Sequence, residues 1–457
     1  MVGTLLTSAL RETQLTRENA WQYPGYMRRK HNEIDRRTLL GLSVGGAVGL
    51  ALPGCKKSAD TGGGGSAGSA GGGGSGGGGE TKEVVIGYVS PQTGPLAPFA
   101  AADAFILERV TKALDAKAIA VDGKKAKFTI KRVDSQSNPT KAGEAAQGLI
   151  ARDKVDLMVV GHTPDTTNPV GAVCEATKTP CVSSLAPIGP WLSGAPYEWT
   201  FHFFWDLPDI ISVFTGMWDT LPTNKVVGAL WPNDPDGSAW APAFTQALEA
   251  KGYKVIDPGR YPNGTSDFSV FVQKWKEAHC EIITGVPIPP DWAACWRQCN
   301  QQGYKPKIAS IGKAILFPAA VEALGEGLAE GLSSEVWWSP AHPFKSSLTG
   351  ETAADLAGAF PQQWSQPLGF VYALFEVAGN ALARAASTDK AKVKAALAAT
   401  KLDTMVGPVS FDDKHVGRTP LVGGQWTKGS KYPWDLHVVF NQTASQIAKT
   451  AELKAIT

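Results

Sequence analysis

Four hydroxyl side chains follow two short apolar runs near the middle of the chain. Thr163 and Thr166 come after the run 157–160, and Ser183 and Ser184 close the next run. The apolar spacing between the two runs is helical, so this stretch predicts strand, loop, helix, strand and a second loop. Ligands of open α/β sheets bind at the carboxyl ends of parallel strands. We therefore expect these hydroxyls and their backbone N–H groups to face one crevice.

Two kinds of chemistry suit such hydroxyls. Ser183 or Ser184 could act as a nucleophile with His162 as its base, or the hydroxyls could hydrogen-bond a bound solute. The sequence has no P-loop, no H-E-x-x-H and no spaced carboxylate pair beside a histidine, and its G-x-S-x-G at 41–45 lies inside an apolar leader. We therefore predict a binding protein that is not an enzyme and that uses no cofactor and no metal.

Short apolar strands alternate with longer helices from Lys82 onward, which is typical of doubly wound α/β folds. The strands expected in a first lobe are 84–89, 128–133, 157–160 and 181–184, and its helices are 100–116, 140–152 and 170–177. A second lobe repeats the scheme with strands 226–230, 254–256, 281–284 and 308–311, and helices 241–251, 268–278, 291–302 and 319–323. Helices at 369–386 and 389–400 are expected to return to the first lobe.

Six segments, spread over nearly all of the chain after residue 80, carry a family resemblance. They are VVIGYVSPQTGPLAPF (84–99), VDLMVVG (155–161), TPCVSSLAP (179–187), KVVGALWPNDPDGSAWAPAFTQALEAKGYKV (225–255), YPNGTSDFSVFVQKWKEAHCEIITG (261–285) and VGPVSFD (406–412). In order and spacing the chain resembles the substrate-binding proteins of ABC importers, in particular the leucine/isoleucine/valine-binding group. The resemblance implies a type I periplasmic binding fold, with two doubly wound, Rossmann-like lobes and a three-segment hinge that lets them close over a ligand.

The resemblance also implies where the lobes divide. The chain should cross between them near 204–206, near 337–340 and again after 405. We expect residues 82–204 and 340–405 to form the first lobe, and residues 205–339 and 406–457 the second. An N-terminal extension with a leader (1–54) and a tether (55–81) precede both lobes.

The first 81 residues predict export and attachment to a membrane. Arg36 and Arg37 precede a Gly-rich apolar stretch that is too short to span a bilayer, a pattern typical of a secretory leader and similar to a Tat signal. The sequence LPGC, ending at Cys55, resembles a lipobox. Diacylation of Cys55, followed by the flexible Gly-rich tether at 61–79, would hold the protein at a membrane surface in the periplasm or outside the cell. A plain cleaved leader with a chance cysteine is the alternative.

Charge and hydropathy exclude several other functions. A net charge of +2 in 457 residues argues against a nucleic-acid partner. After the leader, no apolar run reaches the roughly 20 residues of a membrane span, so we predict neither a channel nor a permease. We expect a monomer that docks onto an ABC permease.

Five cysteines follow the leader. Cys174 with Cys181, and Cys280 with Cys299, could form disulfides because each pair should meet at one end of a sheet. Cys295 and Cys299 share a helix face, but no matching set of metal ligands lies near them in the sequence. Buried free thiols are the alternative.

The resemblance assigns ligand contacts to both lobes. In the family, two first-lobe loops hold the ligand's carboxylate, and Thr163, Thr166, Ser184 and the backbone of Ala186 occupy the matching places here. The family's second lobe often supplies an acidic residue for the α-ammonium, where this chain has Lys313. Two cations would then face each other in a partly desolvated site. This departure argues against a plain branched-chain amino acid.

Tryptophan is abundant, with 15 residues, and several lie at strand ends and crossings, where they could sandwich a flat ligand or simply pack in the core. The full predicted site is Gln92, Thr163, Thr166, Ser183, Ser184, Ala186, Trp205, Trp231, Asp236, Trp240, Pro287, Lys313 and Trp364. We predict a solute-binding lipoprotein that delivers a small carboxylate or amide, with an aromatic part, to an ABC transporter. A binding domain that passes ligand occupancy to a signalling partner is the alternative.

Overall fold

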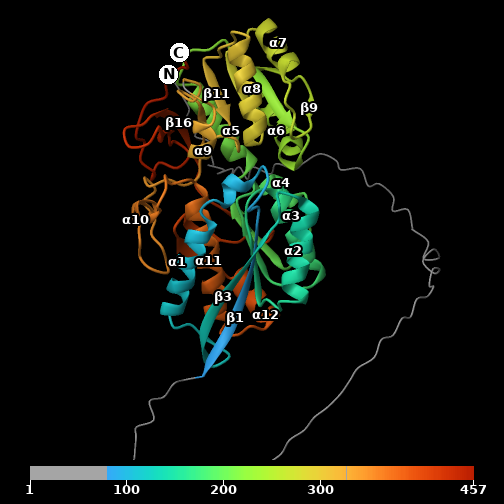
Figure 1. Ribbon diagram of the computed structural model, residues 1–457, viewed down its shortest axis with the longest axis vertical. Coiled ribbons are helices and arrows are strands. Elements are labelled where there is room, and N and C mark those ends of the chain that lie inside the picture. The colour runs from blue at the N-terminus through green and yellow to red at the C-terminus, as the bar shows by residue number, and fades with distance from the viewer. Residues whose placement is uncertain (1–79, 326) are drawn as a thin grey trace, which may run out of the picture. The chain divides into compact units, whose positions relative to one another are not determined.

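The computed structural model describes residues 80–325 and 327–457 (Figure 1). The predicted leader, the predicted lipidation site at Cys55 and nearly all of the Gly-rich tether lie outside the described residues. The described chain forms a seven-stranded sheet, an eight-stranded sheet and a separate pair of strands, β13 (Lys401–Thr404) and β14 (Gly407–Ser410). The two large sheets define the two lobes.

The first lobe is built on a mainly parallel sheet in the order β15-β6-β5-β4-β1-β3-β2. Its strands are β1 (Thr81–Ser90), β2 (Ala120–Val121), β3 (Lys124–Asp134), β4 (Leu157–Val160), β5 (Cys181–Ser184), β6 (Thr200–Phe204) and β15 (Val416–Arg418). Every residue of β4, β5 and β6 is buried, as expected of central parallel strands covered on both faces.

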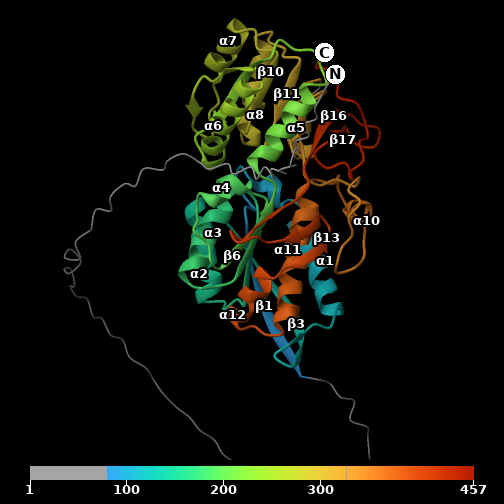
Figure 2. The same cartoon turned by 180° about the vertical axis from the view of Figure 1, so that it is seen from behind.

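Helices cover both faces of this first sheet. They are η1 (Ala97–Ala100), α1 (Asp103–Ala116), α2 (Pro139–Ala151), α3 (Pro164–Ala176), α4 (Ile188–Leu192), α11 (Pro367–Ala385) and α12 (Lys390–Ala398). In two opposite views, α2 and α3 lie on one side of the strands while α1 and α11 lie on the other (Figures 1 and 2). The arrangement is the predicted doubly wound lobe.

The second lobe repeats the scheme in the order β17-β16-β12-β11-β10-β7-β8, with β9 also paired to β7. Its strands are β7 (Val226–Pro232), β8 (Lys254–Ile256), β9 (Arg260–Tyr261), β10 (Ile282–Gly285), β11 (Ile308–Ile311), β12 (Ser333–Val336), β16 (Val422–Lys428) and β17 (Trp434–Phe440). Its helices are α5 (Leu207–Trp218), α6 (Pro235–Ala250), α7 (Ser269–Glu277), α8 (Pro289–Gln301) and α9 (Pro318–Glu322), and α10 (Ala353–Ala359) lies before α11. Strand β16 runs antiparallel to its neighbours β12 and β17.

The chain passes between the two sheets at three places. Strand β6 ends at Phe204, and Asp206 caps α5, which packs on the second sheet. After β12 the chain returns to the first lobe with α11. The third crossing falls later than the expected boundary at residue 405, because β15 pairs with β6 at the edge of the first sheet. It therefore lies between Arg418 and Val422.

The cysteine pairings need correction. All five cysteines in the described residues are buried free thiols, so neither Cys174–Cys181 nor Cys280–Cys299 forms a disulfide. The Cys174 and Cys181 thiols are hydrogen-bonded neighbours, and burial is the main cause that raises the pKa of Cys181. Cys299 pairs instead with Cys295, one turn away on α8, because the two share the buried face of that helix.

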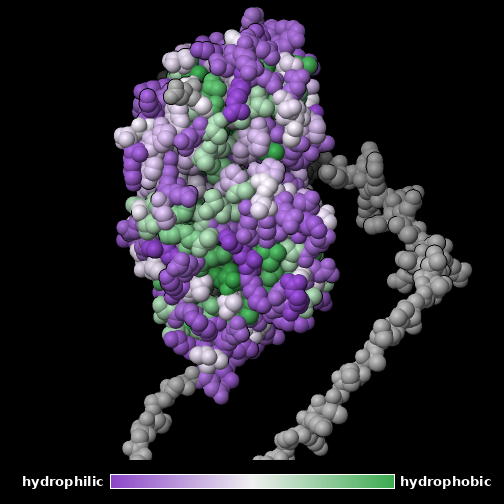
Figure 3. All heavy atoms as spheres, in the orientation of Figure 1, coloured by the Kyte–Doolittle hydropathy of each residue, from purple (hydrophilic) through white to green (hydrophobic). Residues whose placement is uncertain are grey.

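The surface shows few hydrophobic side chains. Polar residues cover most of the face in Figure 3, with hydrophobic ones interspersed. Among the described residues, Val270 on α7 is the one large hydrophobic side chain that is mostly exposed, at 59%. None of the helices in this part of the chain is long and apolar enough to cross a bilayer.

Candidate ligand-binding site

Four non-glycine residues at strand ends have left-handed backbone conformations. His162 and Thr163 follow β4 with φ of 72° and 71°, Leu185 follows β5 with φ of 62°, and Lys313 follows β11 with φ of 62°. Such conformations are uncommon for residues with side chains and cost on the order of 1–3 kcal/mol each. Their concentration at the carboxyl ends of strands marks the place where these sheets bind ligands.

A cavity opens at these strand ends and is lined by both lobes. The first lobe contributes Phe99, Thr163, Leu185, Pro187 and Phe204, and the second contributes Asp236, Trp240, Val286, Lys313, Leu316 and Glu335, with Trp205 and Trp337 at the crossings. It contains about 330 Å³ of empty space, of which about 30 Å³ admits the centre of a water molecule. In this conformation the cavity therefore leaves little free space between its lining side chains.

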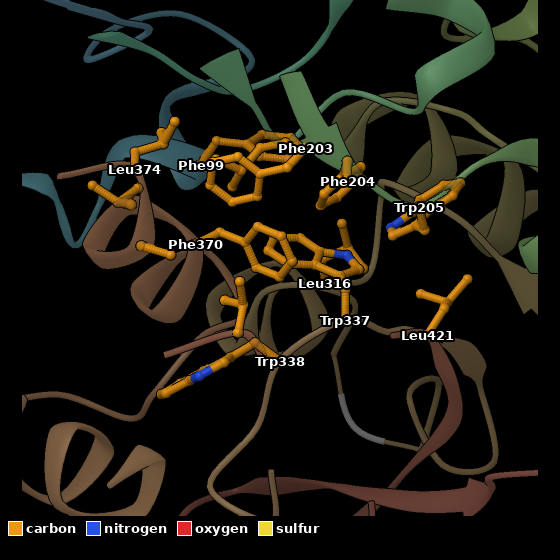
Figure 4. Close-up of a cluster of buried hydrophobic side chains, with 14 of the residues drawn as sticks. Phe99, Phe203, Phe204, Trp205, Leu316, Trp337, Trp338, Phe370, Leu374 and Leu421 are labelled. Carbon is orange, nitrogen blue, oxygen red and sulfur yellow. The ribbon is translucent and has the colours of Figure 1, made fainter. Parts of the chain in front are cut away.

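Aromatic rings form a large part of the cavity wall, with five of the thirteen lining residues. Trp205 meets Trp240 edge to face with ring centroids 6.0 Å apart, and Trp337 contacts Phe204 at 5.3 Å and Phe370 at 5.1 Å. Figure 4 shows Trp337 beside Phe370 in this cluster. These rings fix a flat, apolar lining around a few polar groups, which is the usual composition of a small-molecule site.

Five of the buried polar atoms at the cavity have no hydrogen-bond partner among the described residues. They are Thr163 Oγ1, Asp236 Oδ1 and the indole Nε1 atoms of Trp205, Trp240 and Trp337. An unsatisfied buried polar group costs about 1–3 kcal/mol, so native structures rarely keep several together without a ligand or water to meet them. The cavity therefore has donors and acceptors that are free to form hydrogen bonds with a ligand.

Lys313 is the cation of the site, and two aspartates neutralise it. Its Nζ lies 2.8 Å from Asp234 Oδ2 and 2.8 Å from Asp236 Oδ2. Burial lowers the pKa of Lys313, but the two carboxylates outweigh this and raise its pKa above the ordinary value. The positive charge of Lys313 is therefore shared with two carboxylates, which the sequence alone did not indicate.

The two aspartates differ in environment. Burial raises the pKa of Asp236 to about 6 although Lys313 opposes the shift. Asp234 caps α6 and accepts a hydrogen bond from Gly237 N at 2.8 Å. Burial favours a higher pKa for Asp234, but Lys313 and Gly237 overcome it and lower the pKa. Asp234 therefore keeps its negative charge more readily than Asp236.

Two further carboxyl groups surround this cluster. Glu335 on β12 accepts hydrogen bonds from Lys313 N at 3.2 Å and from Ser334 Oγ at 2.8 Å, and burial raises its pKa to about 7. Asp165, on the first turn of α3 in the other lobe, has its pKa raised by burial while Lys313 opposes the shift. Acidic groups from both lobes therefore approach the same cation.

A family model described as periplasmic binding protein matches residues 83–431. The chain belongs to the periplasmic binding protein family. The predicted type I fold of the branched-chain amino acid-binding kind is confirmed, and the family is one of solute-binding proteins with various ligands.

Individual relatives show how far the similarity extends. The chain is 24% identical over 359 residues to Leu/Ile/Val-binding protein homolog 1 of Brucella abortus, covering 76% of this chain and 91% of the relative. It matches a branched-chain amino acid transporter substrate-binding protein of Streptococcus pneumoniae, solved with isoleucine, at TM-score 0.65, 17% identity, and 79% and 100% coverage. A solute-binding protein of an ABC transporter from Rhodopseudomonas palustris, solved with 3,4-dihydroxybenzoic acid, matches at TM-score 0.62, 19% identity, and 82% and 98% coverage.

Within this periplasmic binding fold, the structure brings five of the predicted site residues to the cavity. They are Thr163, Trp205, Asp236, Trp240 and Lys313. Ser184, which ends β5, and Ala186, on the loop after it, do not line the cavity, and the Ser184 hydroxyl and the Ala186 carbonyl have other partners. Ser184 Oγ donates to Phe203 O, and Ala186 O accepts from His202 Nε2 at 2.7 Å.

The other predicted residues do not line the cavity. Thr166 is buried on α3, Pro287 is buried next to Val286, and Trp231 packs on Trp240 and Phe244 in the core. Gln92 lies on the loop after β1, where its N–H donates to Asp134 at 2.8 Å. Trp364 meets Trp338 at 6.1 Å, away from the lining residues.

The arrangement considered for catalysis is not assembled at the cavity. Ser183 Oγ lies 2.8 Å from His202 Nδ1, not from His162, and neither Ser183 nor His202 lines the cavity. Burial lowers the pKa of His202 to about 3. His162 instead contacts Tyr88 Oη at 2.9 Å and Asp103 Oδ1 at 3.4 Å in the core. The hydroxyl–imidazole contact therefore serves to hold the loop at Ala186.

Sequence reasoning missed eight of the lining residues, which are Phe99, Leu185, Pro187, Phe204, Val286, Leu316, Glu335 and Trp337. Glu335 lies in β12, whose sequence SSEV is mostly polar although the strand is buried, so no apolar run marked it. The apolar members resemble ordinary core residues in sequence. Only the fold distinguishes them.

Proposed function

We propose that the protein is an extracytoplasmic lipoprotein that binds a small solute between its lobes and delivers it to an ABC importer. The observation that supports this most strongly is the group of unpaired buried polar atoms in a cavity lined by both lobes. Because each lobe supplies part of the lining, a bound solute would favour the closed arrangement. The closed conformation has a shape that a permease can distinguish from that of the open protein.

The unpaired groups favour a solute rich in hydrogen-bond acceptors. Trp205, Trp240 and Trp337 each offer an indole N–H, and Thr163 offers a hydroxyl, whereas Asp236 Oδ1 is an acceptor. A small carboxylate or amide with a flat apolar body matches this inventory. The rings around it would stack on that body.

The size of the cavity requires the lobes to move. Its 30 Å³ of water-accessible space holds two or three water molecules, since each needs about 10–15 Å³. A solute with the size of an amino acid enters only if the lobes separate or the tryptophans shift. Three chain crossings between the sheets provide the hinge for such a motion.

Membrane attachment rests on Cys55 and the Gly-rich tether that follows it in sequence. Diacylation would keep the binding lobes within reach of a membrane partner while leaving them free to turn. Replacing Cys55 by Ser should release the protein from the membrane fraction of producing cells. A variant that stays in that fraction would contradict this part of the proposal.

A thermal-shift screen tests the binding function. The purified protein is heated with amino acids, aromatic carboxylates, amides, polyamines and short peptides. A solute at 100 times its Kd stabilises the folded state by about 2.7 kcal/mol, which raises Tm by several degrees. The shift should vanish in Thr163→Val and persist in Thr265→Val, a threonine on an exposed turn. Absence of any shift across the panel would contradict the proposal.

A further inference from the structure

The polar end of the cavity contains an ion cluster that belongs to one lobe. Lys313 follows β11, whereas Asp234 and Asp236 begin α6, and all three side chains are buried. A lysine ammonium has three N–H donors. Two of these donors meet Asp234 Oδ2 and Asp236 Oδ2, so one remains.

The cluster therefore leaves one donor and one acceptor side by side. The donor is the third N–H of Lys313, and the acceptor is Asp236 Oδ1, which has no partner among the described residues. Both residues line the cavity. Asp234 has no such freedom, because its Oδ1 accepts from Gly237 and its Oδ2 also accepts from Asn263 at 3.2 Å.

Neither a positively nor a negatively charged ligand group would find an oppositely charged side chain here that is free of other charged neighbours. A ligand ammonium at Asp236 would lie next to the Lys313 ammonium, and a ligand carboxylate at Lys313 would lie next to the two aspartates and Glu335. The remaining wall is largely aromatic and aliphatic. Burying an additional charge there costs more than burying a neutral polar group that makes the same hydrogen bonds.

We propose that the solute is uncharged at this end and carries a carboxamide-like group, such as a primary amide or a urea. Its carbonyl oxygen accepts from Lys313 Nζ and its N–H donates to Asp236 Oδ1. Lys313 is then a specificity-determining residue, because it takes the position that the ammonium of an α-amino acid would need beside the aspartates. This inference rests on the proposed binding function and specifies its ligand class.

The ionisation of the neighbouring carboxyl groups agrees with this inference. Burial raises the pKa of Asp236 to about 6 and that of Glu335 to about 7. These groups resist further negative charge in the closed cavity. A ligand carboxylate would have to bring a proton with it, whereas an amide would not.

Matched ligands that share one body test the inference directly. Isothermal titration at pH 7 compares benzamide, benzoate and benzylammonium, and then 3-methylbutanamide, 3-methylbutanoate and 3-methylbutylammonium. We expect the amide to bind about tenfold or more tightly than either charged partner in a series that binds. Titrations in two buffers of different ionisation enthalpy should show no net proton exchange for the amide and proton uptake for the carboxylate.

Variants test the role assigned to Lys313. Lys313→Met removes the resident cation, so amide affinity should fall and ammonium affinity should rise about tenfold or more. If the two stranded carboxylates unfold this variant, Asp234→Asn combined with Lys313→Met leaves a single carboxylate and should show the same reversal. The control is Lys307→Met, which breaks an ion pair with Glu281 on the same lobe but away from the cavity and should leave the preference unchanged.

The outcomes separate this inference from the proposed function. Tighter binding of the carboxylate or the ammonium in either series, or no reversal in the folded Lys313 variants, would overturn the inference and leave solute binding intact. If no compound of either series binds but the broader screen identifies a ligand, the ligand's chemistry decides. A ligand with an amide or urea group supports the inference, and a ligand without one overturns it. If no compound in the screen binds, the proposed function itself is contradicted.

Discussion

Phe99 of the first lobe contacts Phe317 of the second lobe edge to face, with ring centroids 4.7 Å apart. Phe99 also lines the cavity and lies 5.9 Å from the ring of His162. Phe317 precedes α9, on the loop that follows Lys313. The pair therefore joins the two lobes beside the ligand cavity and must separate when the lobes open.

Removal of this ring pair should weaken ligand binding by favouring the open arrangement. Aromatic pairs contribute about 0.5–1.5 kcal/mol beyond their buried area, so Phe317→Ala should lower ligand affinity about two- to tenfold. Titration calorimetry on Phe99→Ala, Phe317→Ala and the double variant measures the coupling between the rings. The pair Phe105–Phe360, at 5.2 Å and away from the cavity, is the control, and Phe360→Ala should leave affinity unchanged. Additive effects at Phe99 and Phe317 would contradict a shared role in closure.

The indole N–H of Trp205 should matter for binding more than for folding. Trp205→Phe removes a buried donor that has no partner in the described part of the chain, whereas Trp218→Phe removes one that donates to Ser310 Oγ at 2.8 Å. Both changes delete the same atoms. We expect Trp218→Phe to cost about 1 kcal/mol more stability, by chemical denaturation, and Trp205→Phe alone to reduce ligand affinity. Equal effects of the two variants on affinity would contradict a ligand role for Trp205.

Much of this site could be predicted because its residues follow strands with a clear pattern. The run LMVV is apolar throughout, so β4 and the loop that carries Thr163 could be placed from the sequence. Asp236, Trp240 and Lys313 likewise follow strands that were expected. The ion cluster could not be predicted, since Lys313 is 79 residues from Asp234 and 77 from Asp236. Only the pairing of β7, β10 and β11 brings them together.

The segments around the crossings were harder to predict from the sequence, for a physical reason. Helix α5 was not predicted, because eight of its twelve residues are buried and its solvent-facing side is limited to Pro208, Asp209, Ser212 and Gly216. Strands β6 and β12 were missed as well; they end at or just before the expected crossings at 204–206 and 337–340. The family resemblance supplied the hinge positions but not the strands beside them. Because those strands were not predicted, their cavity residues, such as Phe204 and Glu335, were not predicted either.

The cysteines should remain thiols in the folded protein. Cys174 and Cys181 are hydrogen-bonded but unlinked, and Cys280 is buried and free. Mass spectrometry of protein alkylated under denaturing conditions without a reductant should find all of them modified, and reductant should leave Tm unchanged. A disulfide-linked peptide that joins Cys174 to Cys181 would contradict this prediction.

The contribution of Glu335 to stability should fall as the pH rises from about 4.5 to about 7. Burial raises its pKa from 4.5 to about 7, so between these values the folded state binds a proton that the unfolded state has lost. The stabilisation from the protonated group is complete below about 4.5 and is lost as the pH passes through the folded pKa. Asp236, with a pKa raised from 3.8 to about 6, contributes with the same sign at lower pH.

The variant Glu335→Gln isolates this contribution, because a glutamine keeps the shape of the side chain and does not titrate. The Tm of the original protein relative to that of this variant should fall between pH 4.5 and 7 when both are measured by circular dichroism. Glu108→Gln is the control, since the hydrogen bond from Lys112 lowers the pKa of Glu108 and this exposed group should not contribute to the decline. Parallel curves for Glu335→Gln and the original protein would show that Glu335 is ionised in the folded state throughout this range, with Lys313 N and Ser334 Oγ donating to a carboxylate.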